Sequence, residues 1–130
     1  MKIPSSVKSI DREAFFGCSA LCSVEFNQGL EVIDRLAFGN CFALMSLDLP
    51  KSLVVVGSQA FWNCSSLQSV NFSPFIAKIG DSAFGQCREL KEVNIIKKRL
   101  KEAKKLGNNK SIISEKNKKL VKDDYKLDII

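Results

Sequence analysis

Apolar residues return at the same positions every 23 residues along the first 95 residues of the chain. Within each repeat, apolar and polar residues alternate over one short stretch, as in Leu67-Gln-Ser-Val70-Asn-Phe72. This alternation predicts a short strand with one face buried. We therefore expect strands near 23–26, 46–49, 69–72 and 92–95, paired in one parallel sheet whose apolar positions face a common core.

A second repeated element precedes each of these strands. The sequence Ala-Phe-x-x-Cys occurs four times, beginning at Ala14, Ala37, Ala60 and Ala83, and a leucine follows each cysteine by three residues. A fixed period of this length predicts a solenoid, in which each repeat forms one coil and packs against its neighbours. Asp81 is placed to cap a turn of helix through 83–85, and 77–79 is suited to a short extended segment opposite the main sheet.

The combined pattern, Ile/Val-Gly/Asp-x-x-Ala-Phe-x-x-Cys-x-x-Leu-x-x-Val-x-Phe/Leu, resembles the BspA-type leucine-rich repeats of bacterial and protist surface proteins. The resemblance covers residues 3–95. It implies an α/β leucine-rich-repeat solenoid, with a parallel sheet of short strands on one face and short helical turns and extended segments opposite. It also implies a cell-surface or secreted protein with a role in protein binding or cell adhesion. Gly29, Ser52 and Phe75 stand where ordinary leucine-rich repeats carry Asn or Cys, so no asparagine ladder is expected there.

The distribution of charge separates the chain into two parts. Residues 1–95 hold 8 basic and 9 acidic residues, whereas residues 96–130 hold 12 basic and 5 acidic ones. We expect a solenoid of about four repeats over 1–95 and a basic tail over 96–130. Ile96, Leu100, Ala103 and Leu106 recur at helical spacing in the tail, which predicts a helix over 97–106 that caps the last repeat.

The first residues match the end of a repeat strand, because Ile3-Pro4 aligns with Leu49-Pro50. We therefore expect the chain to be a fragment that opens in mid-repeat, with no secretory signal at Met1. The sequence contains no uninterrupted apolar run of 18 residues, so no transmembrane segment is expected.

Four of the five cysteines, at 18, 41, 64 and 87, occupy the same position in the repeat. Side chains stacked in one column point the same way, which suits neither a disulfide between neighbours nor a tetrahedral metal site. We expect these four to be buried, reduced thiols that pack as small hydrophobic groups. Cys22 shares its column with Met45, Gln68 and Lys91, so it is expected on the surface.

The sequence offers no catalytic constellation. It contains no histidine, which excludes Ser-His-Asp and Cys-His catalysis and removes the commonest metal ligand. We therefore expect no enzyme activity, no cofactor and no metal.

Two surfaces are candidates for contact with a partner. The outward positions of the predicted strands form two columns of mostly small, polar side chains. One column is Ser23, Ser46, Ser69 and Glu92, and the other is Glu25, Asp48, Asn71 and Asn94. These columns either contact a protein or surface-glycan partner or are simply solvated. A few aromatic residues in the turns suit a partner contact or self-association if they gather on one face, namely Phe16, Phe42, Trp62 and Phe75.

Two functions remain open from the sequence. The first is a non-catalytic interaction or adhesion module that presents its strand face to a macromolecule. The second is binding of a polyanion, such as nucleic acid or an anionic surface, through the lysine-rich tail, with the solenoid as a scaffold. Tyr125 is the only aromatic residue of that tail, so the tail offers few side chains on which nucleic-acid bases could stack.

Overall fold

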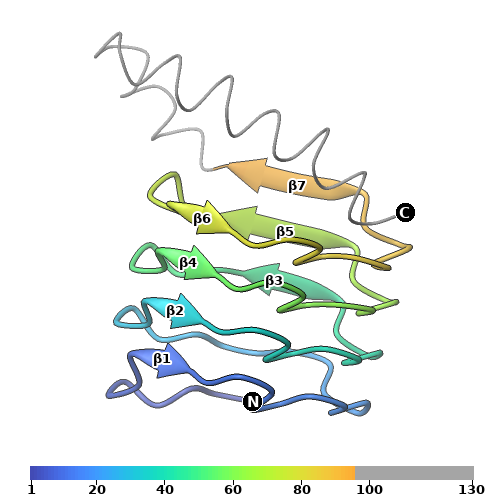
Figure 1. Cartoon of the computed structure of the whole chain (residues 1–130), viewed down its shortest axis with the longest axis horizontal. Coiled ribbons are helices and arrows are strands. Elements are labelled where there is room, and N and C mark those ends of the chain that lie inside the picture. Colours follow the sequence, from blue (N-terminus) through green and yellow to red (C-terminus); the bar gives the residue numbers. More distant parts are fainter. Residues whose placement is uncertain (96–130) are drawn as a thin grey trace, which may run out of the picture.

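The computed structural model describes residues 1–95, which form a stack of coils with one coil for each 23-residue repeat (Figure 1). Two parallel sheets run along the stack. One sheet consists of β1 (Ser9–Ile10), β2 (Val32–Ile33), β4 (Val55–Val56) and β6 (Lys78–Ile79). The other consists of β3 (Ser46–Asp48), β5 (Ser69–Phe72) and β7 (Glu92–Ile95).

Every strand pairing keeps the 23-residue offset seen in the sequence. Val32 pairs with Val55, and Val70 pairs with Val93, both in parallel ladders. Because the offset never changes, each apolar column becomes a row of inward side chains along the solenoid. Phe72, for example, is 1% exposed. The predicted strands near 46–49, 69–72 and 92–95 and the parallel pairing are confirmed, and 77–79 supplies β6.

The extended segments expected opposite the main sheet pair into a second parallel sheet, because each coil contributes a two-residue strand on that side. One detail of the predicted main sheet is wrong. Residues 23–26 do not form a strand, since their only sheet contact is an isolated parallel bridge between Glu25 and Lys2. A single bridge does not extend into a ladder.

The predicted helical turns are also absent from residues 1–95, and the backbone angles show why. Glu13 and Leu36 have φ values of 59° and 56°, in the left-handed region that interrupts a right-handed helix. Successive backbone N–H groups then donate alternately within the turn and to the next coil. The Phe16 N–H donates to Glu13 O within the turn at 3.1 Å, whereas the Phe15 N–H donates to Ala37 O in the next coil at 2.8 Å. The segment is a turn that hydrogen-bonds along the solenoid.

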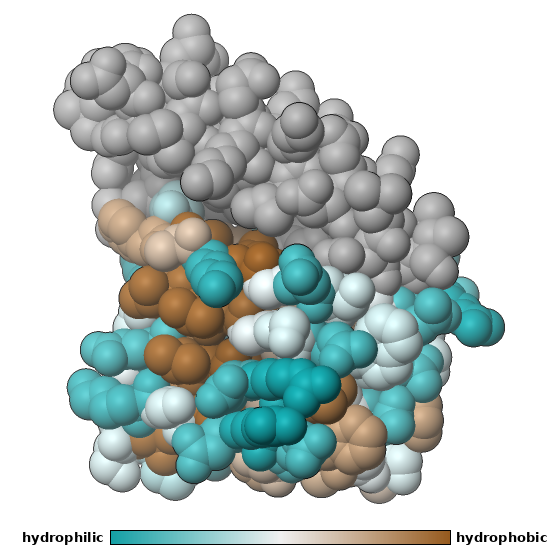
Figure 2. Space-filling view, in the orientation of Figure 1, coloured by the Kyte–Doolittle hydropathy of each residue, from teal (hydrophilic) through white to brown (hydrophobic). Residues whose placement is uncertain are grey.

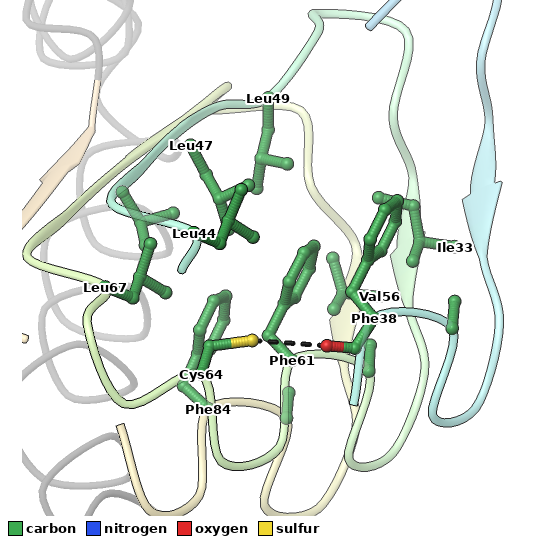
Figure 3. Close-up of a cluster of buried hydrophobic side chains, with 14 of the residues drawn as sticks. Ile33, Phe38, Leu44, Leu47, Leu49, Val56, Phe61, Cys64, Leu67 and Phe84 are labelled. Atoms are coloured by element: carbon green, nitrogen blue, oxygen red, sulfur yellow. Dashed lines mark hydrogen bonds between the residues drawn. The ribbon is translucent and has the colours of Figure 1, made fainter. Parts of the chain in front are cut away.

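Stacked phenylalanine rings form the centre of the core (Figure 3). The rings of Phe38 and Phe61 lie 5.2 Å apart with their planes at 3°, and Phe61 and Phe84 repeat that distance at 6°. Phe15 continues the stack on Phe38 at 5.2 Å and 17°. Parallel strands are spaced about 4.8 Å apart, close enough to the ring separation for one phenylalanine per coil to stack without strain.

The cysteine column lies beside this stack and is tied to it. The thiols of Cys41, Cys64 and Cys87 each donate to the carbonyl oxygen of the phenylalanine in the preceding coil, at 3.3, 3.2 and 3.1 Å. All three side chains are 0% exposed, as predicted, and Cys22 is exposed, also as predicted.

The prediction for Cys18 is wrong, because this residue is exposed. It lies in the first coil, where no described residue provides the phenylalanine carbonyl and the apolar neighbours that the other three thiols have. The expected helix over 97–106 and the rest of the basic tail lie outside the described residues.

Phe61→Ala should lower the free energy of unfolding by about 3–5 kcal/mol, because it empties the middle of the ring stack. Phe16→Ala is the matched control, since Phe16 is 46% exposed and its removal leaves no internal cavity. Urea denaturation of both variants measures the difference. Equal losses for Phe16 and Phe61 would show that the stack does not form the core.

Candidate partner-binding surface

The outward face of the sheet β3–β5–β7 carries six of the eight polar residues expected from the sequence to contact a partner. Alternation along each strand turns Leu47 and Val70 inward and leaves the residues on either side of them on the surface. The strand register then aligns them across the sheet in two rows, Ser46–Ser69–Glu92 and Asp48–Asn71–Asn94.

Hydrogen bonding orders part of this face. Asn94 Nδ2 donates to Asn71 Oδ1 at 3.0 Å, so the two amides lie side by side along the solenoid. Asn71 accepts through its oxygen, so its Nδ2 group and the second N–H of Asn94 Nδ2 are the donors left on this row. Asp48, next in the row, is exposed and supplies a carboxylate acceptor. The row therefore presents donors and acceptors in a fixed order, which suits hydrogen bonding to a polar ligand.

The other two predicted contact residues, Ser23 and Glu25, are exposed on the first coil, where the strand is replaced by the single bridge to Lys2. Glu25 Oε1 lies 3.9 Å from Lys2 Nζ, and both side chains are more than 70% exposed. Such a pair is screened by water and contributes little stability. It does place a cation beside the carboxylate, so this end of the face is less acidic than the sequence columns suggest.

The predicted aromatic contact residues do not form one cluster. Phe16 lies over Gly39 of the next coil, where an added Cβ would come within 2.8 Å of the Phe16 ring. Trp62 shares that column and is half-buried. Phe42 is 41% exposed in the connection from β2 to β3, whereas Phe75 is 53% exposed in the connection from β5 to β6, at the opposite edge of the coils (Figure 1).

A different apolar surface was missed by the sequence reasoning. Val32 and Val55 point outward from β2 and β4 and are half-buried, and the neighbouring Val54 is 40% exposed. Figure 2 shows apolar side chains gathered over this sheet. The sequence contained the signal, because both valines share a column with Ser9 and Lys78. The interpretation considered only the adjacent inward column, in which Ile10, Ile33 and Val56 are buried and Ile79 is half-buried.

Two of the buried thiols, those of Cys41 and Cys64, are held in their neutral form. Burial, with the neighbouring Cys64 as a lesser cause, raises the pKa of Cys41 from its ordinary value of 9.0 to about 12. Contact with the Cys87 thiol and then burial raise the pKa of Cys64 as well. A thiol must lose its proton to act as a nucleophile or metal ligand, so these two thiols are suited to packing rather than chemistry.

Within residues 1–95, no group of three or more Cys, Asp or Glu side chains is placed to hold a metal ion. Among the same residues, no helix has the length and apolar character needed to cross a membrane.

Comparison with known families identifies the repeat. The chain matches the BspA type leucine rich repeat region, in six copies, over residues 1–110. The protein therefore belongs to the BspA-type leucine-rich repeat family. No curated protein matches the chain.

Solved structures with the same fold support this assignment. A leucine-rich repeat protein of T. pallidum is 39% identical with a TM-score of 0.69, over 71% of this chain and 43% of its own. One from Bacteroides ovatus is 35% identical with a TM-score of 0.67, over 72% of this chain and 24% of its own. A leucine rich cell surface protein of Faecalibacterium prausnitzii is 25% identical with a TM-score of 0.55, over 74% of this chain and 31% of its own. The chain thus spans less than half the length of these proteins.

The raised pKa of Cys41 predicts a loss of stability at high pH. Below about pH 9 the thiol is protonated in both the folded and the unfolded chain. Between about pH 9 and pH 12 only the unfolded chain loses this proton. Unfolding is therefore increasingly favoured as the pH rises through this range. The slope is at most about 1.4 kcal/mol per pH unit for one thiol. Urea denaturation of the reduced protein at pH 8, 9 and 10 should therefore show a steeper decline for the parent than for Cys41→Ala. Parallel curves would contradict a protonated, buried Cys41.

Proposed function

We propose that this protein is a non-catalytic interaction or adhesion module that binds a protein or a surface glycan through the β3–β5–β7 face. The observation that carries the proposal is the pair of polar rows on the outward side of the sheet, held in register by the parallel ladder. The residues at the ends of each row are exposed, and the middle ones, Ser69 and Asn71, are half-buried. A rigid face of this kind can match a macromolecule over several coils, because each coil repeats the spacing of the last.

The chemistry of the face favours a polar, hydrogen-bonding partner. The two rows combine hydroxyl, amide and carboxylate groups, and Asp48 and Glu92 are exposed acids among them. Mild acidity of this kind favours partners that offer hydroxyl, amide or basic groups, and it disfavours nucleic acid. Family membership supports the same direction, since leucine-rich repeats are interaction scaffolds. A surface or secreted location is part of the proposal, supported by the F. prausnitzii relative, which is described as a cell surface protein.

Polyanion binding through residues 96–130 remains the second candidate, favoured by the 12 basic residues in that segment. Such binding would weaken steeply with salt, because it depends on release of counterions from the anion. Binding through the strand face should depend on salt much less. The salt dependence of any binding therefore separates the two candidates.

Replacing Ser69 and Asn71 with arginine should weaken binding by the strand face at least about tenfold, because both residues lie in the middle of the polar rows. Ser9→Arg with Gln28→Arg is the matched control, since it adds the same charge at exposed positions off this face. Binding is measured on a glycan array and on immobilised extracellular-matrix proteins.

Heparin and single-stranded oligonucleotides are the probes for the second candidate. Neutralising Lys116, Lys118, Lys119 and Lys122 with glutamine should leave glycan or matrix binding unchanged and reduce only heparin or oligonucleotide binding. The strand face is not the binding site if the Ser69→Arg and Asn71→Arg variant binds as the parent does, while the variant with four lysines replaced by glutamine no longer binds the glycan or matrix protein.

A further inference from the structure

An aromatic column runs along the turns that follow β1, β2, β4 and β6, at the edge of the solenoid where the chain crosses from one sheet to the other (Figure 1). At 23-residue spacing this column reads Phe16, Gly39, Trp62 and Gly85, so a large ring alternates with a glycine. The Phe16 ring fills the place of a side chain at Gly39, because a Cβ there would come within 2.8 Å of it. Phe16 is nevertheless 46% exposed, and Trp62 is half-buried. Two coils that are not adjacent thus each present a partly open ring.

A row of amide side chains lies beside this column, at the next position of each turn. The row reads Gly17, Asn40, Asn63 and Gln86, and Asn63 Nδ2 donates to Asn40 Oδ1 at 3.0 Å. Within residues 1–95, Asn40 Nδ2 and Asn63 Oδ1 make no further hydrogen bond, so the pair retains both donors and an acceptor. An added Cβ at Gly17 would meet nothing within 4 Å, which shows open space beside Phe16.

The spacing of the two rings indicates what kind of ligand fits. Buried phenylalanine rings of neighbouring coils stack 5.2 Å apart. Positions two coils apart are therefore separated by about 10 Å. An extended β-1,4-linked glycan repeats at this same length, because every second sugar turns the same face to the same side. The C–H face of a sugar packs on the negative face of an aromatic ring, and sugar hydroxyls both donate and accept hydrogen bonds.

We propose that this edge of the solenoid binds a neutral β-1,4-linked glycan, with alternate sugars stacked on Phe16 and Trp62. The sugar between them lies at the Asn40–Asn63 pair and exchanges hydrogen bonds with the two amides. The aromatic column and the amide row contain no charged residue, which favours a neutral glycan over an anionic one. The Trp62 indole N–H makes no hydrogen bond within residues 1–95 and is not buried, so it is available to a hydroxyl group.

A polyproline peptide is the other extended chain that packs on aromatic rings. It offers only carbonyl acceptors, so it would use the amide donors and leave the Asn63 Oδ1 acceptor unmatched. A glycan uses the donors and the acceptor together. The chemistry of the row therefore favours the glycan.

Fluorescence of Trp62 measures binding directly, because this residue is the only tryptophan of the chain. Cellohexaose and chitohexaose are the probes, and at least one of them should change the emission of the full chain in a saturable way. Cellobiose or chitobiose should bind at least about tenfold more weakly than the matching hexasaccharide, because two sugars do not reach both rings.

Phe16→Ala should weaken hexasaccharide binding by at least about tenfold, because it removes one of the two stacking rings. Phe75→Ala is the matched control and should leave binding unchanged, since Phe75 is 53% exposed at the opposite edge of the coils. Urea denaturation verifies that both variants are folded. If Phe16→Ala is not folded, Phe16→Leu replaces it, because leucine keeps an apolar side chain over Gly39 and offers no ring.

Three results would overturn the proposal: no saturable change with either hexasaccharide, equal affinity of the parent and the folded Phe16 variant, or stronger binding of decaproline than of both hexasaccharides. The site is separate from the β3–β5–β7 face and does not depend on the function proposed for that face. Arginine at Ser69 and Asn71 should therefore leave the Trp62 signal unchanged. Loss of hexasaccharide binding in that variant would place the glycan on the strand face and would also overturn the proposal.

Discussion

The 23-residue register between coils is the constraint on which the rest of this structure depends. It aligns three interactions at once: the parallel strand ladders, the stacked phenylalanine rings and the donation of each buried thiol to a phenylalanine carbonyl. A change of one residue in any repeat would turn inward side chains outward and misalign all three. The absence of insertions between the four Ala-Phe-x-x-Cys copies is therefore a physical requirement of the fold.

The strands themselves are too short to hold the fold. Each strand of residues 1–95 has two to four residues, and such segments are stable only because each coil hydrogen-bonds to the coils beside it. The turns contribute as well, since alternate amides along them donate to the next coil at 2.7–3.2 Å, as Phe38 does to Ala60 and Asn40 to Trp62. Function follows from the same repetition. Every outward position becomes a row, and a row of varied polar groups on a rigid sheet is a surface suited to recognition.

The sequence predicted the parts of the fold that depend on side-chain pattern. Apolar alternation located β3, β5 and β7, and the invariant Ala-Phe-x-x-Cys located the core. It did not reveal the left-handed backbone at Glu13, Leu36 and Gln59, because these residue types do not signal positive φ. The predicted helical turns were wrong for that reason. Cys18 was wrongly predicted to be buried because the prediction treated all four copies of the repeat alike. Burial of the thiol depends on a preceding coil, which the first coil of the described residues lacks. The polar rows could be listed from the sequence, but the Asn71–Asn94 hydrogen bond and the Lys2–Glu25 pair needed coordinates.

Amide hydrogen exchange tests the central role of the register most directly. The N–H groups of Phe38 and Phe61 lie in turns, outside any strand, yet each donates to the next coil at 2.7 Å. If coil-to-coil bonding holds the fold, these two amides should exchange only when the whole solenoid unfolds, as slowly as the amide of Val70 in β5. Exchange of Phe38 and Phe61 at the rate of exposed loop amides, with Val70 still protected, would contradict the account.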